Sequence, residues 1–351
     1  MSRSSLAVAL CFFFAAADSR GGNITTELFA VKKSDSQVYA LKFDTAGQPV
    51  GGYTLATTGQ VLSISATRDG SGNPFLFAVG TDNQVYTLQF DASGNPVGKF
   101  VLATAGTVQS ITATRGPAGN PFLLVQGLDS QVHTLRFNSS NQAVGTYTLT
   151  TPGQVEQISA STDRSRNPFL FARLSDQQVH TLKFDTGGNA VGTYSTLPTP
   201  AGMVHGISGT IGSAGNPFLF VRGTNDQVFK ASFDASGNPV GPYTPTTADQ
   251  VKSISGTFGP AGNPLLFAVK SDDQVYTLRF NSAGDPVGGY VLTTPGEVNS
   301  ISATSLRTLV GSSPPVPELP SIYLLAASMG ILIIRQFMIR TRAGGVAGAP
   351  A

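Results

Sequence analysis

The chain has almost none of the residues on which disulfide-stapled, metal-clustered or nucleic-acid-binding proteins depend. Among its 351 residues there is one cysteine, Cys11, and no tryptophan. A single cysteine cannot form an internal disulfide or supply a cysteine metal cluster. Charged residues make up 12% of the chain and the formal net charge is +2, so we expect no basic stripe and no nucleic acid partner. No motif for a cofactor is present, and we expect none.

Helix-length apolar periodicity is also missing between the two ends of the chain. In its place a repeat recurs at intervals of about 47 residues, which is in the range of propeller blades. Its copies begin near Leu28, where the copy is degenerate, and at Asn73, Asn120, Asn167, Asn216 and Asn263. These six copies predict six similar structural units.

The second copy shows what one unit contains. It has four runs rich in β-branched and aromatic residues: Phe75–Val79, Gln84–Phe90, Val97–Leu102 and Val108–Thr114. The links between them are short and rich in Asp, Asn, Gly and Pro, so consecutive runs are expected to pair as antiparallel strands. One four-stranded sheet cannot bury both of its faces alone. We therefore predict an all-β fold, a six-bladed β-propeller spanning residues 18–305.

The fourth run predicts the radial order of the strands. It is built largely from Ser, Ala, Thr and Gly, and each copy carries one isoleucine: Ile64, Ile111, Ile158, Ile207, Ile254 and Ile301. Small side chains fit where blades converge, so this run should lie at the axis and the Val97–Leu102 run at the rim.

The order of the runs also predicts how the ring closes. The first copy begins without an inner run, and the last copy ends with one. We predict that Val298–Thr304 pairs beside Leu28–Val31, because an open ring would leave unpaired strand edges. An open or solenoid β-array is the alternative architecture.

Residues 1–17 are predicted to be a secretory signal peptide. Arg3 precedes an apolar run, Leu6–Ala17, that ends in three alanines before Asp18, as at a small-residue cleavage site. In the alternative interpretation Cys11–Ala17 is a decayed inner strand. The bulk of Phe12–Phe14 at a crowded axis favours the signal peptide.

The end of the chain predicts a membrane anchor. Residues 306–321 form a linker rich in Pro and Ser. Residues 322–339 are largely apolar and, at about 1.5 Å per residue in a helix, just long enough to span a bilayer core as a transmembrane helix. The basic tail, residues 340–351, should stay cytoplasmic, which places the propeller outside the cell.

This region resembles the PEP-CTERM sorting signal of bacterial surface proteins, in which a short Pro-Glu motif precedes one membrane helix and a basic cluster. The matching residues are Val316, Pro317, Glu318, Pro320, Ser321, Arg340 and Arg342. The resemblance implies export and a processing enzyme of the exosortase type as a partner. A plain membrane anchor is the alternative. The repeats are similar in architecture to tandem-repeat propellers of bacterial surface proteins and lectins, a likeness that implies no activity.

Recurring polar residues are the candidates for chemistry. His133 and His180 stand where other copies have Tyr or Phe, which indicates an aromatic packing position. The Asp-x-x-Gly-Asn turns contain too few acids for a calcium loop, so turn capping by Asp is expected. The Asp-x-Gln element is either a turn or a repeated ligand pocket between blades. In the second interpretation the ligand positions are Asp35, Gln37, Asp82, Gln84, Asp129, Gln131, Asp272 and Gln274.

These features predict a binding or structural module rather than an enzyme. No carboxylate pair, or nucleophile with a base, interrupts the repeat, so no catalytic or metal-ligating residue is predicted. With no tryptophan for stacking on sugars, the recurring tyrosines Tyr53, Tyr147, Tyr194, Tyr243 and Tyr290 could take that role. We expect a surface-anchored module that binds a glycan or a polymer of the envelope or matrix. The alternative is a propeller hydrolase or lyase that acts on polysaccharide.

Overall fold

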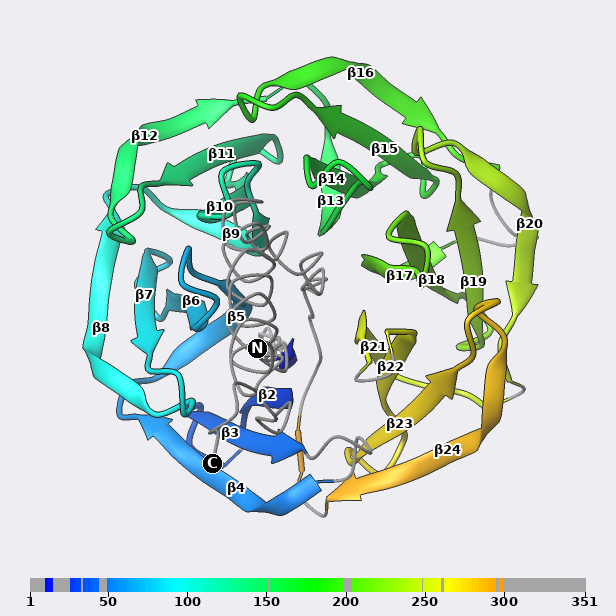
Figure 1. Ribbon diagram of the computed structural model, residues 1–351, viewed down its shortest axis with the longest axis horizontal. Coiled ribbons are helices and arrows are strands. Elements are labelled where there is room, and N and C mark those ends of the chain that lie inside the picture. The colour runs from blue at the N-terminus through cyan, green and yellow to red at the C-terminus, as the bar shows by residue number, and fades with distance from the viewer. Residues whose placement is uncertain are drawn as a thin grey trace, which may run out of the picture. The chain divides into compact units, whose positions relative to one another are not determined.

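The computed structural model describes residues 10–14, 26–32, 34–43, 49–150, 152–198, 204–247, 249–259, 262–294 and 297–298. They form six four-stranded antiparallel sheets, each made of strands that are consecutive in the chain. The sheets stand around a common axis as the blades of a propeller (Figure 1). The predicted six-bladed β-propeller with four-stranded blades is confirmed.

Each blade runs from an inner strand through a second and a third strand to an outer strand at the rim (Figure 1). The inner strands are β1 (Leu10–Phe14), β5 (Val61–Arg68), β9 (Val108–Arg115), β13 (Val155–Thr162), β17 (Val204–Ile211) and β21 (Ser253–Phe258). The second strands are β2 (Thr26–Val31), β6 (Pro74–Gly80), β10 (Pro121–Gly127), β14 (Pro168–Leu174), β18 (Pro217–Gly223) and β22 (Pro264–Val269). The third strands are β3 (Val38–Phe43), β7 (Val85–Phe90), β11 (Val132–Phe137), β15 (Val179–Phe184), β19 (Val228–Phe233) and β23 (Val275–Phe280). The outer strands are β4 (Pro49–Thr57), β8 (Pro96–Thr104), β12 (Ala143–Leu149), β16 (Ala190–Thr196), β20 (Pro239–Pro245) and β24 (Pro286–Thr294). Blade 1 is therefore β1–β4 and blade 6 is β21–β24, and the predicted radial order is confirmed.

The hydrophobic core lies between neighbouring blades. The second strand is covered on both faces, and every residue of β10 is buried. Between blades 2 and 3 the rings of Phe77 and Phe137 are 5.1 Å apart, and between blades 4 and 5 those of Phe171 and Phe233 are 5.2 Å apart. Each blade thus depends on its neighbours for burial of its apolar faces.

The inner strands are joined from blade to blade by buried hydroxyl groups. Each accepts a hydrogen bond from a backbone N–H of the next inner strand: Ser65 from Ala113 (2.8 Å), Thr112 from Ala160 (2.9 Å), Ser159 from Gly209 (2.8 Å) and Ser208 from Gly256 (2.7 Å). The approach is close, because a Cβ added at Gly209 would lie 2.7 Å from the ring of Phe171. Small residues are therefore required on the inner strands, as their composition predicted.

The prediction for ring closure is wrong. The inner strand of blade 1 is β1, whose Leu10 pairs with Ala30 and whose Phe14 pairs with Thr26. The edge of β2 needs hydrogen-bond partners, and the backbone of Leu10–Phe14 supplies them. The segment that the signal-peptide interpretation would remove is thus paired as a strand, and cleavage after residue 17 stays a prediction.

One residue of the predicted closing strand is described. Val298 forms an isolated antiparallel bridge with Lys32, and its N–H donates to the carbonyl of Asp273 at 2.8 Å. Val61, at the start of blade 2, donates the same type of bond to the carbonyl of Ser36 in blade 1 at 2.9 Å. Residues 299–304 lie outside the described residues.

The predicted membrane anchor and sorting motif also lie outside the described residues, which end at Val298. Within the described ranges, no helix is long and apolar enough to cross a membrane.

Candidate functional site

The Asp-x-Gln residues lie in the turns between second and third strands, where they hold the turn together. The carboxylate of Asp82 accepts hydrogen bonds from the N–H of Gln84 (3.1 Å) and the hydroxyl of Tyr86 (2.7 Å). The bond from Tyr86 is the main reason why the pKa of Asp82 lies below its ordinary value. Asp35, Asp129 and Asp272 accept the same backbone bond, from Gln37, Gln131 and Gln274. These carboxylates are used by their own turns, and ligand binding by these residues stays a prediction.

The two repeated histidines take the place of tyrosine in this arrangement. His133 Nε2 lies 3.1 Å from Asp129 Oδ2, and His180 Nε2 lies 2.9 Å from Asp176 Oδ2. Tyr86 and Tyr276 place their hydroxyls against Asp82 and Asp272 in the same way. The imidazoles thus take the place of tyrosine in the repeat, where each lies within hydrogen-bond distance of the turn aspartate.

The recurring outer-strand tyrosines are packed against the cores between blades. Tyr147 and Tyr194, for example, lie against the clusters at blades 2 and 3 and at blades 3 and 4. Burial raises the pKa of both phenols to about 12. Rings held in this way are poorly placed to stack on a sugar.

A different set of residues lies at the junctions between blades, where a side chain of one blade bonds to a loop of the next. The fifth residue of each third strand is called here the bridging position, and at the junctions whose loops are described it lies near the loop between the third and outer strands of the next blade, called here the outer loop. At three junctions this residue is a cation bonded to that loop. Lys42 Nζ donates to the carbonyl of Ser93 (2.6 Å), Arg136 to Asn189 Oδ1 (2.6 Å) and Lys183 to Asn238 Oδ1 (3.5 Å). These side chains span the junctions between blades 1 and 2, 3 and 4, and 4 and 5.

At two other junctions the bridging position is not a cation, and a groove is open there. Gln89 lines a cavity of about 580 Å³ between blades 2 and 3, called here groove 2/3. Ser232 lines a cavity of about 190 Å³ between blades 5 and 6, called here groove 5/6. The remaining bridging residue is Arg279, and the outer loop of blade 1, residues 44–48, lies outside the described residues.

Groove 2/3 has walls of two kinds. Strands β7 and β8 contribute Gln89, Val97, Lys99 and Val101, and the outer loop of blade 3 contributes residues 140–142. Amide and hydroxyl groups therefore lie beside exposed aliphatic side chains. Its volume is in the range of small-ligand sites, which combine apolar surface with a few polar groups.

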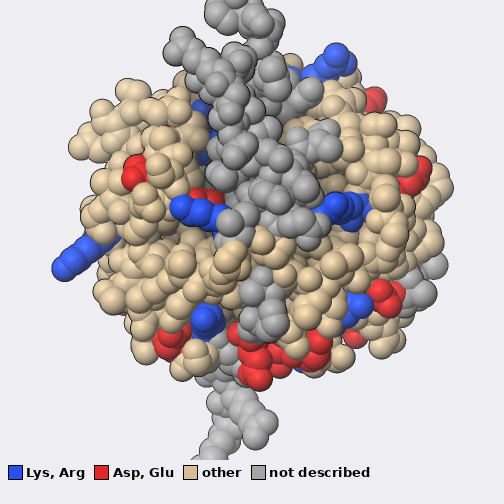
Figure 2. All heavy atoms as spheres, turned by 60° about the horizontal axis from the view of Figure 1, so that its bottom comes forward, with Lys and Arg blue, Asp and Glu red and all other residues tan. Residues whose placement is uncertain are grey.

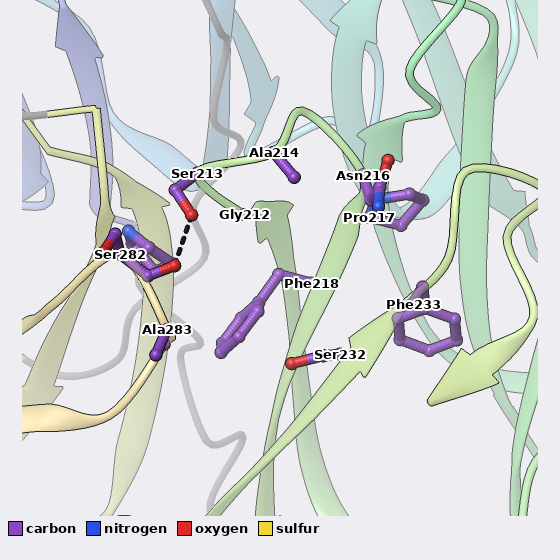
Figure 3. Close-up of a pocket in the computed structure, with 12 residues that line it drawn as sticks. Gly212, Ser213, Ala214, Asn216, Pro217, Phe218, Ser232, Phe233, Ser282 and Ala283 are labelled. Atoms are coloured by element: carbon purple, nitrogen blue, oxygen red, sulfur yellow. Dashed lines mark hydrogen bonds between the residues drawn. The ribbon is translucent and has the colours of Figure 1, made fainter. Parts of the chain in front are cut away.

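Groove 5/6 is smaller and carries no charged side chain in its lining (Figure 3). The ring of Phe218 lies between Ser232 and the loop that carries Ser282 and Ala283. The hydroxyl of Ser213 donates to the carbonyl of Ser282 across the junction. Lys230, two residues before Ser232, also crosses the junction: its ammonium group donates to the carbonyl of Gly284 and, at 2.6 Å, to Asp285 in the outer loop of blade 6. Its volume is smaller than that of typical small-molecule sites, so it can hold only part of a ligand of that kind.

The junction between blades 1 and 2 contains a buried acid. Glu27 is 2% exposed and occupies the position of Phe75, Phe122, Phe169 and Phe218 in other blades. Burial raises its pKa to about 7, although Lys42 Nζ lies 3.7 Å from its carboxylate. Within the described part of the chain, neither carboxylate oxygen accepts a hydrogen bond. The charged form of this carboxylate is therefore unfavourable inside the fold.

The surface carries little concentrated charge. On the side shown in Figure 2, Lys and Arg side chains are scattered over a largely uncharged surface, and acids gather at its lower edge. Among the described residues visible on this side, the basic side chains form no continuous stripe.

Comparison with known proteins shows the fold but no family. No protein-family model matches the chain, and a search of curated proteins finds no match. Among solved structures, AofleA from Arthrobotrys oligospora is 11% identical with a TM-score of 0.65, over 84% of this chain and 88% of that chain. The BP39L lectin from Burkholderia pseudomallei is 16% identical with a TM-score of 0.60, over 85% and 88%. A variant of the Aleuria aurantia lectin in complex with alpha-methyl-L-fucoside is 12% identical with a TM-score of 0.58, over 83% and 96%.

The residues at the bridging positions of these grooves were not predicted from the sequence. The signal was present, because an alignment of the six copies shows Gln89 and Ser232 where the others have Lys or Arg. What that difference means depends on the position of the outer loop of the next blade. The spacing within one copy does not give that position.

Proposed function

We propose that this propeller is a carbohydrate-binding module that holds a glycan or a polymer of the cell envelope or extracellular matrix in grooves between its blades. The observation that carries the proposal is the pair of open grooves at junctions 2/3 and 5/6, where the fifth residue of the third strand is Gln89 or Ser232 and not a cation. Amide groups next to aliphatic side chains suit a sugar, which presents hydroxyl groups and apolar C–H faces. The likeness in fold to a lectin in complex with alpha-methyl-L-fucoside supports the same class of ligand.

A glycan array probed with the full-length chain tests this proposal. We expect a defined subset of glycans to bind, with the affinity lowered by changes in groove 2/3. Because single sites of this kind are weak, retention should increase when the glycan is displayed at high density. An array on which no glycan binds above background would refute the proposal.

We also propose that binding rather than catalysis is the activity. The acids of the repeated turns that the structure describes accept hydrogen bonds from their own backbone, as Asp91 does from Ser93 and Asn95. Carboxylates used in this way are poor candidates for a general acid and base pair. Release of new sugar ends from a bound polysaccharide would favour the alternative, a hydrolase or lyase.

We further propose that the chain is exported and anchored through residues 322–339, with the propeller outside and with processing by an exosortase-type enzyme. The sequence pattern of both ends supports this location. Added protease should then digest the propeller on intact cells while a cytoplasmic marker survives. Protection of the propeller until the cells are lysed would contradict it.

A further inference from the structure

Groove 2/3 departs from the repeat at two positions that line the same space. Its bridging residue is Gln89, where the neighbouring junctions have Lys42 and Arg136. Its outer strand carries Lys99, and the corresponding residues of the other outer strands are Gly52, Thr146, Thr193, Pro242 and Gly289. Groove 2/3 therefore has no cation at its bridging position, Gln89, and has a cation, Lys99, in its wall.

Lys99 is exposed, and the structure gives its ammonium group no ion pair or hydrogen bond within the described residues. Other lysines of the propeller are paired: Lys230 with Asp285 at 2.6 Å, Lys252 with Asp273 at 2.6 Å and Lys270 with Asp249 at 3.3 Å. No Asp or Glu lines groove 2/3. The charge of Lys99 is thus available to a ligand.

The rest of the lining suits a sugar ring next to that charge. Gln89 and Gln142 are exposed amides on opposite walls, and both can donate and accept hydrogen bonds. Val97 and Val101 are 55% and 63% exposed, and they provide an apolar surface on the strand that carries Lys99. An acidic group on the sugar would pair with the ammonium group, and its hydroxyls would bond to the amides.

We infer that groove 2/3 binds an acidic sugar unit, with Lys99 pairing its carboxylate or sulfate group. This inference rests on the proposed function and names the ligand class for one of its two grooves. Groove 5/6, which has no charged lining residue, is not expected to show this preference.

The test measures binding of the full-length chain to an oligomer of galacturonic acid and to the methyl ester of that oligomer. The ester keeps the sugar units and removes their charge. The acid form should bind more tightly, and Lys99→Gln should weaken its binding by about fivefold to tenfold, while Lys99→Arg keeps most of it. Binding of the ester should hardly change. Lys252→Gln is the matched control, because Lys252 is exposed, lines neither groove and already pairs with Asp273 at 2.6 Å. A sulfated oligosaccharide of similar length shows whether carboxylate or sulfate is preferred.

Three results would overturn the inference. They are equal binding of the acid and the ester, an unchanged affinity in Lys99→Gln, and equally tight binding of polyglutamate, which carries carboxylates without sugars. Binding of neutral glycans only would overturn this inference and leave the proposed function standing. If no glycan binds, both are refuted.

Discussion

Replacing Glu27 by phenylalanine should raise the free energy of unfolding by about 3 kcal/mol above neutral pH, and by much less near pH 5. Burial raises the pKa of Glu27 from 4.5 to about 7 in the folded protein. Between these values the folded state holds a proton that the unfolded state has released, so stability falls as the pH rises through this window. Above about pH 7 the full penalty remains. Phenylalanine removes the titrating group.

The site should accept the larger side chain. Four other blades have phenylalanine at this position, and at Gly188 and Gly284 the neighbouring outer loop already lies against Phe122 and Phe218. In blade 2 the same loop position is Gly94, which faces Glu27. Its φ of +75° also favours glycine over other residues. The charged groups that act on Glu27 are Lys42, Arg68 and Asp91. The hydrogen bond of Lys42 to Ser93 does not require Glu27.

Urea unfolding at several pH values between about 4.5 and 8 measures the effect. Glu27→Gln is the matched variant and should flatten the pH profile with a smaller gain in stability. Glu297→Gln, at an exposed position, should leave the profile unchanged. The aspartates of the turns have lowered pKa values, as Asp91 does because of its bond from Asn95, so their contribution is lost only at more acidic pH. A wild-type profile that is flat across this window would contradict the assignment.

Replacing Gln89 by arginine should weaken glycan binding by about tenfold or more, equivalent to about 1.4 kcal/mol of binding free energy. Arg136 shows the expected geometry one junction further on, where its guanidinium bonds to Asn189 at 2.6 Å. Gln142 occupies the corresponding place in the outer loop of blade 3. The new side chain should bond there and fill groove 2/3.

Affinity for the best glycan found on the array measures this effect. Gln89→Ala keeps the groove open and should cost much less. Arg136→Gln makes the reciprocal change, and it should open a groove between blades 3 and 4. Melting temperatures should be similar for the three variants, since all of these side chains are exposed. Tighter glycan binding by Gln89→Arg would contradict this prediction. It would show that the added positive charge favours binding more than the filling of groove 2/3 hinders it.

The sequence alone was sufficient for the architecture of the blades. Strand runs such as Val108–Thr114, the tight turns between them and the repeat spacing are local properties, and local pairing follows from them. β9 spans Val108–Arg115, only one residue longer than predicted. The turn role of residues such as Asp91 was predictable for the same reason, because its partners Ser93 and Asn95 are two and four residues away.

Only the tertiary structure decided three further features: which segment pairs with β2, which junctions are open, and where an acid is buried. Any segment with β propensity can satisfy a free strand edge, so sequence pattern could not choose between Leu10–Phe14 and the run that begins at Val298. Gln89 and Glu27 differ visibly from their counterparts in other copies, but their consequences come from the neighbouring blade. A groove or a raised pKa arises from groups brought together across a junction. The distance between groups on neighbouring blades is set by the closed ring rather than by any one repeat.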